Sequence, residues 1–394
     1  MIPKSISFAK PVKKVTFCKN CVNSNLRPRL LFNDEGICDA CTYSFRKYKE
    51  INWKKREKEL VSLLNKFRSK TGKFDVIVPS SGGKDSSYVA HQLKYKYGMN
   101  PLCVCWAPSM YTDIGWENME TFCKKFDTII FIPNREIHSK LTRVAFEYFG
   151  DVLQPWQYGM EGYPQRVAEE YNIPLIMYGE NQWEEYGGAQ GKKFSGENTL
   201  ERRKKNQSMR VKKGVDTLVE IGVEKKILDK KYLKKKDFFE HYRLTKQRKV
   251  KNKPIKSYFY SYFKKWVPHD HFYYAVENCG FKVDSERTEG TFTKYASLDD
   301  KIDELYFYFQ FLKFGFGRST TEACREIRDG YITREEGVNL VKLYDGEFPA
   351  RYLDDCLEYM NMDKNKFFKI EEKFRNKNLF KKIKGSWKLK NQVT

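Results

Sequence analysis

The chain has 394 residues, of which 40% are hydrophobic and 16% aromatic, so it can bury two or three domain cores and is not disordered. No apolar run approaches the roughly 20 residues of a membrane span, and the N-terminus lacks a secretory signal, so we expect a soluble, cytoplasmic protein. The formal net charge of +23 is concentrated in residues 192–256, with a net charge of +15, and in residues 364–394, with +9. Such uneven charge is typical of a protein with a polyanionic partner, and equally of a lysine-rich solvated surface.

Residues 1–70 form a small cysteine-bearing module, which ends in a helix predicted at 53–67. Two Cys-x-x-Cys pairs lie sixteen residues apart, namely Cys18 with Cys21 and Cys38 with Cys41. Without an export signal, this spacing is typical of a structural zinc site with four thiolate ligands. A redox or iron–sulfur role is the weaker interpretation, because neither pair has the third nearby cysteine of common cluster motifs.

Residues 71–190 alternate strands with helices. Short apolar runs predict buried strands at 74–79, 101–106, 127–133 and 174–179. Amphipathic segments predict helices at 86–97, 115–126, 136–149 and 160–171. Apolar strands that alternate with helices are typical of a parallel sheet covered on both faces. We therefore predict an α/β domain with a doubly wound, mostly parallel, Rossmann-like sheet.

A polar loop with two glycines, SSGGKDSS at residues 80–87, joins the first strand to the first helix. The glycines let the backbone turn tightly near a ligand, and the start of the helix offers free N–H groups. The loop matches neither the Walker A spacing nor G-x-G-x-x-G. We interpret it as a pyrophosphate-binding loop; an ordinary turn with Ser or Asp as the helix cap is the alternative.

Polar residues also follow two other strands. Glu180 and Asn181 come directly after the strand at 174–179, so we expect them near the same edge of the sheet. A carboxylate and a carboxamide there could hold Mg²⁺ or orient ammonia and substrate. A helix N-cap followed by a first-turn acid explains the pair equally well. Thr112 and Asp113 follow the second strand, and the same two interpretations, a ligand-binding role or a helix cap, apply to them.

Residues 191–394 are predicted to form a basic, mostly helical domain that binds substrate or a partner. We interpret the weakly patterned stretch 192–256 as a lid, an inserted arm or a solvated surface. Helices are predicted at 298–314, 320–328, 334–344 and 350–359. Three short segments combine polar side chains with glycine or lie close to it: EGT (289–291), LDDK (298–301) and FGFGR (314–318). Their residues Thr291, Lys301 and Arg318 are the candidates for substrate binding. None of the five histidines shows the spacing of metal ligands.

The loop resembles the PP-loop of the ATP pyrophosphatase superfamily, whose members cleave ATP to AMP and pyrophosphate. The matching positions are Ser81, Gly82, Gly83, Asp85 and Ser86, and Lys84 fills the variable position. The resemblance implies a HUP-type sheet with the nucleotide at the carboxyl ends of its strands. We therefore predict that ATP is bound by Ser81, Gly82, Gly83, Asp85, Ser86 and Ser87 of this loop and by Gly179 at the end of the strand at 174–179. The predicted catalytic residues are Lys84 and Asp85 of the loop and Glu180 and Asn181 after that strand.

Longer segments resemble the N-acetyl sugar amidotransferases of surface-polysaccharide biosynthesis. These segments are CKNCVNSNLRPRLLFNDEGICDAC, VPSSGGKDSSYVA, MYGEN, EGTFTKYASLDDKIDELYFYFQFLKFGFGRST and REIRDGYITREEGVNLVKLYDGEFP. The resemblance implies that the N-acetyl oxygen of a nucleotide-linked uronic acid or a nonulosonic acid is adenylated. Ammonia then replaces it to give an acetamidino group, with release of AMP and pyrophosphate. ATP, Mg²⁺ and structural Zn²⁺ are the implied cofactors.

The source of ammonia points to a partner protein. The chain has no recognisable glutaminase nucleophile, so the resemblance implies a separate glutaminase with an ammonia-conducting subunit. A tRNA-thiolating PP-loop enzyme is the main alternative, since such enzymes use the same adenylation and the chain is basic. No RNA-binding module is recognisable, so we do not expect nucleic acid as a partner. A binding protein with an inactive loop is disfavoured by the intact SGGKDS.

Overall fold

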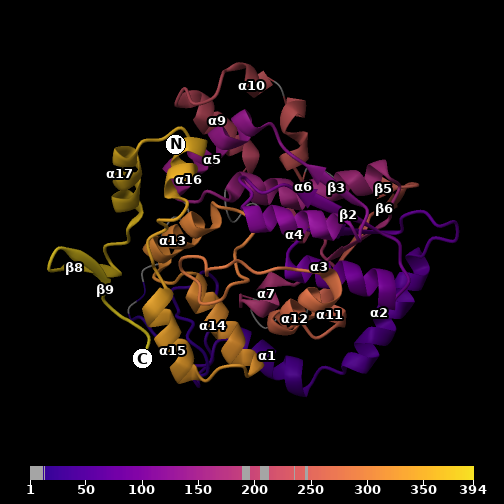
Figure 1. Cartoon of the computed structure of the whole chain (residues 1–394), viewed down its shortest axis with the longest axis horizontal. Helices are drawn as coiled ribbons and strands as arrows, with labels where there is room; N and C mark the ends of the chain where they lie inside the picture. Colours follow the sequence, from indigo (N-terminus) through magenta and orange to yellow (C-terminus); the bar gives the residue numbers. More distant parts are fainter. Residues whose placement is uncertain (1–11, 13, 189–195, 205–212, 235, 245–246) are drawn as a thin grey trace.

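A five-stranded sheet forms the centre of the computed structural model, which describes residues 12, 14–188, 196–204, 213–234, 236–244 and 247–394 (Figure 1). Its strands are β1 (Val76–Pro79), β2 (Pro101–Trp106), β3 (Thr128–Phe131), β4 (Leu175–Tyr178) and β7 (Lys256–Phe259). The spatial order is β3-β2-β1-β4-β7, and every neighbouring pair is parallel. The strand order reverses at β1, between β2 and β4, and open parallel sheets bind ligands at the carboxyl ends of strands at such a point.

Helices cover both faces of the sheet, as the sequence predicts. Val76 and Val78 of β1 pack on one face, and Ile77 packs on the other, because successive residues of a strand point in opposite directions. The first face is covered by α2 (Trp53–Phe67), α3 (Lys84–His91), α4 (Asp113–Cys123) and α11 (Tyr260–Phe263). The second face is covered by α5 (Arg135–Phe149), α6 (Gln154–Glu170) and α9 (Val215–Glu224). A short π-helix, η1 (Gln92–Lys96), continues α3.

The fifth strand, β7, was not predicted. It lies where the sequence places a mostly helical region, and it pairs with β4 in the register Tyr178 to Phe259. Its four residues alternate half-buried and buried side chains, a pattern too short to distinguish from the surrounding aromatic sequence. The four predicted strands are all present, three of them shorter than their apolar runs.

The described part of the basic stretch contributes to the core. Leu218 and Ile221 of α9 and Phe239 of the 3₁₀ helix η2 (Lys236–Tyr242) pack with α5 and α6. A helical turn, α10 (Lys231–Lys234), and a small hairpin of β5 (Lys249–Val250) and β6 (Lys253–Pro254) complete it. The interpretation as a lid or arm also covered residues 192–195, 205–212, 235 and 245–246, which lie outside the described residues.

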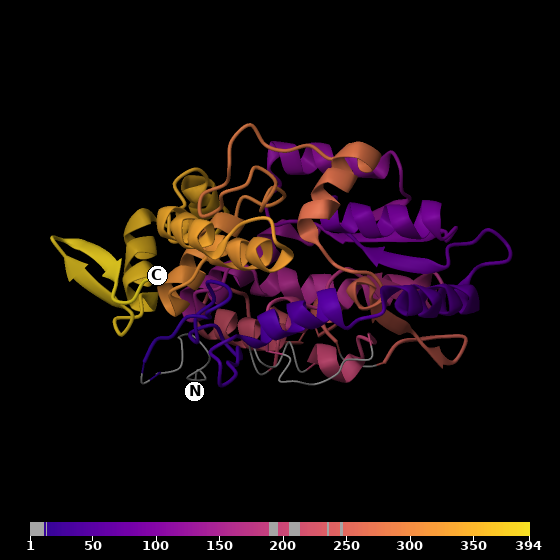
Figure 2. The same ribbon diagram turned by 90° about the horizontal axis from the view of Figure 1, so that it is seen from below.

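The C-terminal part is mostly helical; its helices from α13 onward gather at one end of the molecule, with the sheet toward the other, whereas α12 packs on α3 (Figure 2). Its helices are α12 (Pro268–Cys279), α13 (Asp303–Phe314), α14 (Arg318–Asp329), α15 (Arg334–Tyr344), α16 (Leu353–Tyr359) and α17 (Lys364–Phe374). A hairpin of β8 (Phe380–Ile383) and β9 (Ser386–Leu389) projects beyond them. Phe146 of α5 shares a core with α13, α16 and α17, so the two regions pack directly together.

The N-terminal module packs against two other C-terminal helices, α14 and α15. Its helix α1 (Asp39–Lys49) and the four clustered cysteines share a core with Ala323 and Cys324 of α14 and Val338 of α15. Among the described residues, no helix combines the length and apolar character needed to cross a bilayer.

Candidate functional site

A cavity of about 180 Å³ lies at the start of α3, beyond the carboxyl end of β1. Residues 81–86 of the glycine loop form one wall. The opposite wall comes from residues 295–299, from Asp303 at the start of α13, and from Arg318 and Arg325 of α14. The cavity therefore joins segments more than 200 residues apart in the sequence.

Two glycines shape this cavity through close backbone approaches. Gly82 has a φ of +79°, and a Cβ there would lie 2.9 Å from the Cα of Met119, so its position excludes larger residues on both counts. A Cβ on Gly115 would lie 2.6 Å from the Cα of Asp299. The loop thus rests on α4, and α4 in turn rests on the opposite wall.

The loop is closed by its own hydroxyl groups. The backbone N–H of Ser81 donates to the Ser86 hydroxyl at 3.4 Å, and that hydroxyl donates to the Gly83 carbonyl at 3.0 Å. Gly83 is the N-cap of α3. The first N–H groups of a helix have no partner within the helix, so the N-terminus of α3 is suited to an anion.

Asp85 is the most strongly paired carboxylate of the loop. It forms an ion pair with Lys84, and its Oδ1 lies 2.8 Å from Nδ1 of His271 on α12. Burial by itself would raise the pKa of Asp85, but Lys84 and His271 hold it well below its usual range. Asp85 is therefore ionised at neutral pH, as a cation ligand must be.

The opposite wall carries two acids and a cation. Burial raises the pKa of Asp299. The Ser81 hydroxyl and the cations Arg318 and Lys84 oppose this rise. The pKa of Asp303 is raised further, by burial and by the neighbouring charges of Asp299 and Asp300. The ionised Asp85 on the loop and Arg318 on this wall give the cavity charges of both signs, which suits a ligand that carries phosphates and a metal ion.

Arg325 is the second arginine of this wall. Its Nη1 donates to the Tyr186 hydroxyl at 3.1 Å. Burial opposes its charge, yet the nearby groups Tyr186, Glu322, Asp85 and Glu180 hold its pKa above the usual value. Burial and the charge of Asp85 raise the pKa of Glu180, so this carboxylate is electrostatically coupled to the loop although it does not line the cavity.

The other residues predicted near β4 and the loop serve the framework. Asn181 is the N-cap of α7 (Gln182–Glu185); its Oδ1 accepts from the N–H of Trp183, and its own N–H donates to Ser261. The Gly179 carbonyl accepts from the N–H of Ser261, and Ser87 is buried beside Cys279. These three positions do not line the cavity.

Thr112 also caps a helix: its hydroxyl accepts from the N–H of Gly115 and donates to the carbonyl of Leu298. The carboxylate of Asp300 accepts from the N–H groups of Ser109 and Met110 at 2.6 and 3.0 Å. The segment after β2 is thus fastened to the wall that carries Asp299.

Of the three predicted substrate residues, Arg318 lines the cavity. Thr291 is buried in a turn, where its hydroxyl donates to the Thr288 carbonyl at 2.8 Å. Lys301 forms an ion pair of 2.7 Å with Asp355 outside the cavity. Sequence reasoning missed His271, Asp299, Asp303 and Arg325. The acidic LDDK string was a signal for Asp299, but His271 has no local signal, because only packing brings it to the loop.

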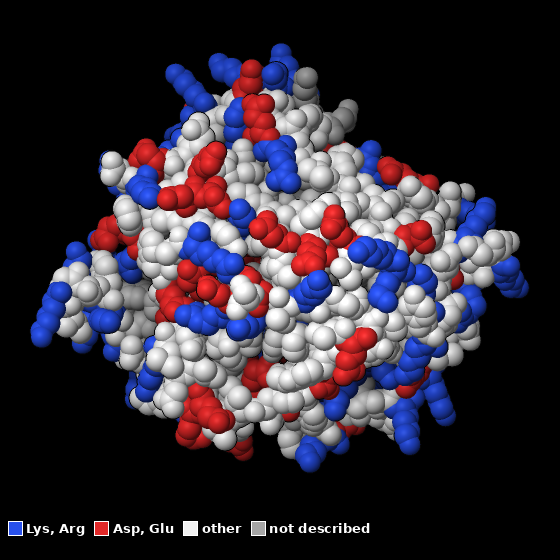
Figure 3. All heavy atoms as spheres, viewed as in Figure 1, with Lys and Arg blue, Asp and Glu red and all other residues white. Residues whose placement is uncertain are grey.

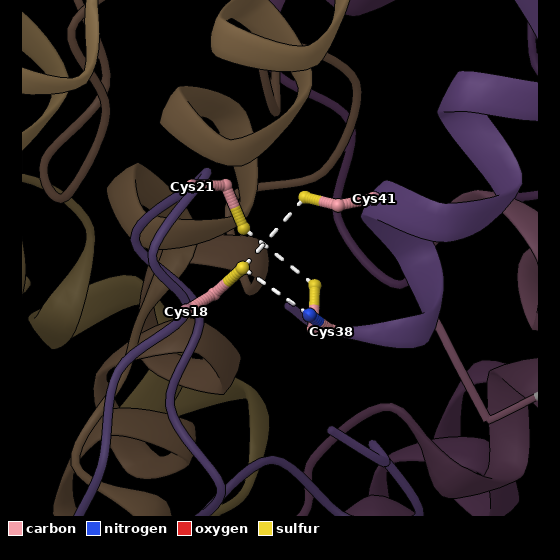
Figure 4. Close-up of side chains that lie close together, drawn as sticks. All are labelled: Cys18, Cys21, Cys38 and Cys41. Carbon is pink, nitrogen blue, oxygen red and sulfur yellow. Dashed lines mark hydrogen bonds between the residues drawn. The ribbon is translucent and has the colours of Figure 1, made fainter. Parts of the chain in front are cut away.

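The four N-terminal cysteines form a second candidate site (Figure 4). All four sulfurs are buried and lie within 4.8 Å of one another. The Cys18–Cys41 and Cys21–Cys38 sulfurs are 3.9 and 3.7 Å apart. Tetrahedral Zn–S bonds of 2.3 Å require sulfurs about 3.8 Å apart, so the residues fit a zinc ion. Backbone N–H groups of Asn23 and Cys38 approach the sulfurs of Cys21 and Cys18 and would stabilise thiolates.

The cysteine module is fastened to α14, the helix that carries Arg318 and Arg325. Arg27 donates to the Thr321 hydroxyl at 2.7 Å, and the Ser44 hydroxyl donates to the Arg328 carbonyl at 3.3 Å. Lys47 of α1 pairs with Asp329 at 2.8 Å. The module therefore braces one wall of the cavity.

Positive charge is spread widely over the surface. Figure 3 shows Lys and Arg side chains projecting at the left, over the β8–β9 hairpin, and at the right, over the region of α2, with acidic groups between them. This distribution gives no single basic groove on the face shown.

Residues 289–394 match the family model described as the C-terminal domain of WbpG-like lipopolysaccharide (LPS) biosynthesis proteins. This segment contains α13 and α14, which supply Asp303, Arg318 and Arg325 to the cavity. LPS is a surface polysaccharide, so the match supports the polysaccharide-biosynthesis part of the resemblance for this segment, and it is consistent with a sugar-modifying role in LPS synthesis.

The chain is also similar to an uncharacterized protein, MJ1599, of Methanocaldococcus jannaschii. The two are 32% identical over 121 residues, which is 30% of this chain and 43% of that protein. The match therefore spans less than half the length of either protein.

Proposed function

We propose that this protein is an ATP-dependent amidotransferase of LPS synthesis, which converts the N-acetyl group of a sugar precursor to an acetamidino group. One observation carries the proposal: a glycine loop at a helix N-terminus borders a charged cavity at the carboxyl edge of a parallel sheet, and the facing wall belongs to an LPS-biosynthesis domain. The loop suits a polyphosphate, and the domain suits a sugar.

The reaction has a clear physical logic. An amide carbon is a poor electrophile, so ammonia does not replace its oxygen unaided. Attack of the amide oxygen on the α-phosphorus of ATP releases pyrophosphate and turns that oxygen into part of a good leaving group. Ammonia then adds to the carbon, the C–O bond breaks with departure of AMP, and loss of a proton leaves the acetamidino group.

The loop would bind the nucleotide. The hydroxyls of Ser81 and Ser86 and the first N–H groups of α3 would hold the departing pyrophosphate, and Lys84 would offset its growing charge. Asp85 is the residue suited to hold Mg²⁺, which when bound would neutralise charge on the phosphates. Ser87 and Gly179 support the loop from behind through α12 and the end of β4.

The facing wall would bind the acceptor. Arg318 and Arg325 are suited to acidic groups of a sugar precursor, whether a carboxylate or a nucleotide phosphate. Glu180, whose pKa is raised by burial and by the charge of Asp85, would act on the site through this electrostatic coupling to the loop, and Asn181 fixes the turn that carries it. Ammonia would come from a separate glutaminase partner.

Mass spectrometry of the reaction tests this proposal. The protein would be incubated with ATP, Mg²⁺, ammonium and a panel of N-acetylated UDP-uronic acids and nonulosonic acids, with AMP followed in parallel. We expect one sugar to exchange oxygen for NH, and we expect Asp85→Asn to lower the rate by about 10²- to 10³-fold, because a charge that stabilises the transition state is lost.

Asp127→Asn is the matched control, since Asp127 is exposed at the amino end of β3, on the far edge of the sheet. It should retain the wild-type rate. If no sugar changes but tRNA stimulates AMP release, the amidotransferase proposal fails and an RNA-modifying activity replaces it.

A further inference from the structure

The two carboxylate oxygens of Asp85 accept hydrogen bonds from two side chains that differ in how freely they can move. Oδ2 accepts from the Lys84 ammonium, and Oδ1 accepts from Nδ1 of His271 at 2.8 Å. Lys84 and Asp85 both line the cavity, whereas His271 is not among the described residues that line it. His271 therefore reaches the carboxylate from behind, out of the space that a ligand would fill.

The imidazole of His271 is fixed in position. It is 2% exposed, it stacks on the ring of Tyr88 with centroids 4.1 Å apart, and it meets the edge of Trp266 at 4.3 Å. Its helix α12 packs along α3, and the Cys279 thiol of α12 approaches the Ser87 carbonyl at 3.7 Å. The donor and the loop therefore behave as one rigid unit.

Lys84 is a different kind of donor. Its ammonium stands at the end of four flexible methylene groups and can move to another anion without disturbing the backbone. A polyphosphate in the cavity would offer such an anion. When Lys84 transfers to it, Oδ2 of Asp85 becomes free to bind a cation, while Oδ1 keeps its bond to His271.

The geometry of this pair fixes where the His271 proton lies. An ionised carboxylate can only accept hydrogen bonds, so the ring nitrogen that lies 2.8 Å from Oδ1, Nδ1, must carry a proton. Carboxylates that bind metal ions are commonly oriented by a second hydrogen-bonding group of this kind.

We propose that His271 is a positioning residue for a divalent-cation site: its Nδ1–H fixes Oδ1 of Asp85 so that Oδ2 is presented to Mg²⁺ once Lys84 has moved to the nucleotide. The cation role rests on the proposed function, whereas the histidine–carboxylate pair is a property of the protein alone.

Metal binding by two variants tests the proposal. His271→Asn retains an amide donor close to the position of Nδ1, and His271→Leu has none. Binding of Mn²⁺, as a probe for Mg²⁺, would be measured by electron paramagnetic resonance in the presence of a non-hydrolysable ATP analogue. We expect His271→Leu to bind Mn²⁺ about 10- to 100-fold more weakly, and His271→Asn to bind close to wild type.

Each outcome has a definite meaning. Wild-type affinity in a folded His271→Leu protein, or equal loss in both variants, overturns the positioning role and leaves the proposed function intact. Failure of the wild-type protein to bind the analogue with Mn²⁺ overturns the proposed function and the cation role together.

A measurement on the unsubstituted protein keeps the proposal testable even if His271→Leu does not fold. Nitrogen-15 chemical shifts distinguish the two neutral tautomers of histidine. We expect the Nδ1–H tautomer at His271 in the ligand-free protein at pH 7, and the Nε2–H tautomer would overturn the proposal.

Discussion

Single side chains in this protein are held by burial as much as by their partners. His138 of α5 is 1% exposed; its Nδ1 meets the Tyr242 hydroxyl at 3.0 Å, and its Nε2 has no hydrogen-bond partner among the residues that the structure describes. Burial, followed by the charge of Arg135, lowers the pKa of His138 to about 3. The ring therefore stays neutral in the folded protein at a pH where the unfolded chain binds a proton.

We predict that His138 makes the protein less stable as the pH falls below the ordinary histidine pKa. Between pH 7.5 and pH 5 the unfolded state gains a proton that the folded state cannot bind, which costs about 2 kcal/mol of the free energy of unfolding. His138→Asn keeps a polar partner for Tyr242 and should remove this dependence.

Urea unfolding of both proteins across this range measures the effect. All other titrating groups are shared, so the difference between the two pH profiles isolates His138. Parallel profiles would contradict the prediction.

At the scale of elements, α14 is the helix on which the site depends. It carries Arg318 and Arg325 to the cavity, and its C-terminal end is fastened to α1 by a buried ion pair. Nζ of Lys47 lies 2.8 Å from Oδ1 of Asp329 and 3.5 Å from Oε2 of Glu185. All three side chains are at most 5% exposed. The same ammonium donates to the Trp266 carbonyl, next to the segment that leads into α12.

We predict that Lys47→Met lowers the free energy of unfolding by about 3–5 kcal/mol, because it leaves two buried carboxylates without their cation. Lys49→Met is the matched control: it makes the same substitution two residues away on an exposed face of α1, and should change stability by less than about 0.5 kcal/mol. Chemical denaturation compares the two. Similar losses in both variants would show that helix propensity, not the ion pair, is responsible.

At the scale of the whole molecule, the cysteine module and the α/β sheet meet the C-terminal helices from two sides. The module shares its core with α14 and α15, and α5 of the sheet domain contributes Phe146 to a core with α13, α16 and α17. The cavity lies where the sheet and these helices face each other, so the position of α14 depends on a module far from it in sequence.

We predict one Zn²⁺ per chain, and we predict that Cys38→Ser removes it and loosens α14 as well as α1. A four-cysteine site supplies folding free energy directly, so its loss should release the helices packed on it. Metal analysis gives the zinc content, and amide hydrogen exchange gives the local effect. Exchange should rise in α1 and α14, while β1 and β2 stay protected.

Cys123→Ser is the control, since Cys123 is exposed on the surface of α4. It should retain the zinc and the protection of α14. Unchanged exchange in α14 of a zinc-free Cys38→Ser protein would show that the module does not brace this wall.

Local patterns by themselves determined the part of this protein that surrounds the loop. Apolar runs, amphipathic periods and the Cys-x-x-Cys spacing predicted four strands, the helices between them, and the four-cysteine cluster, because each depends on neighbours in the chain. The alternation of strands and helices also predicted that residues 81–86 lie at the carboxyl end of β1.

The residues that face this loop are brought there by packing between distant parts of the chain. His271 and Asp85 are 186 residues apart, and the strand β7 is too short for its pattern to be recognised without its partner β4. Asp303 and Arg325 reach the cavity because α13 packs with α5, α16 and α17, and α14 packs on the cysteine module. Contacts of this kind depend on how whole elements pack, which periodicity within one element does not encode.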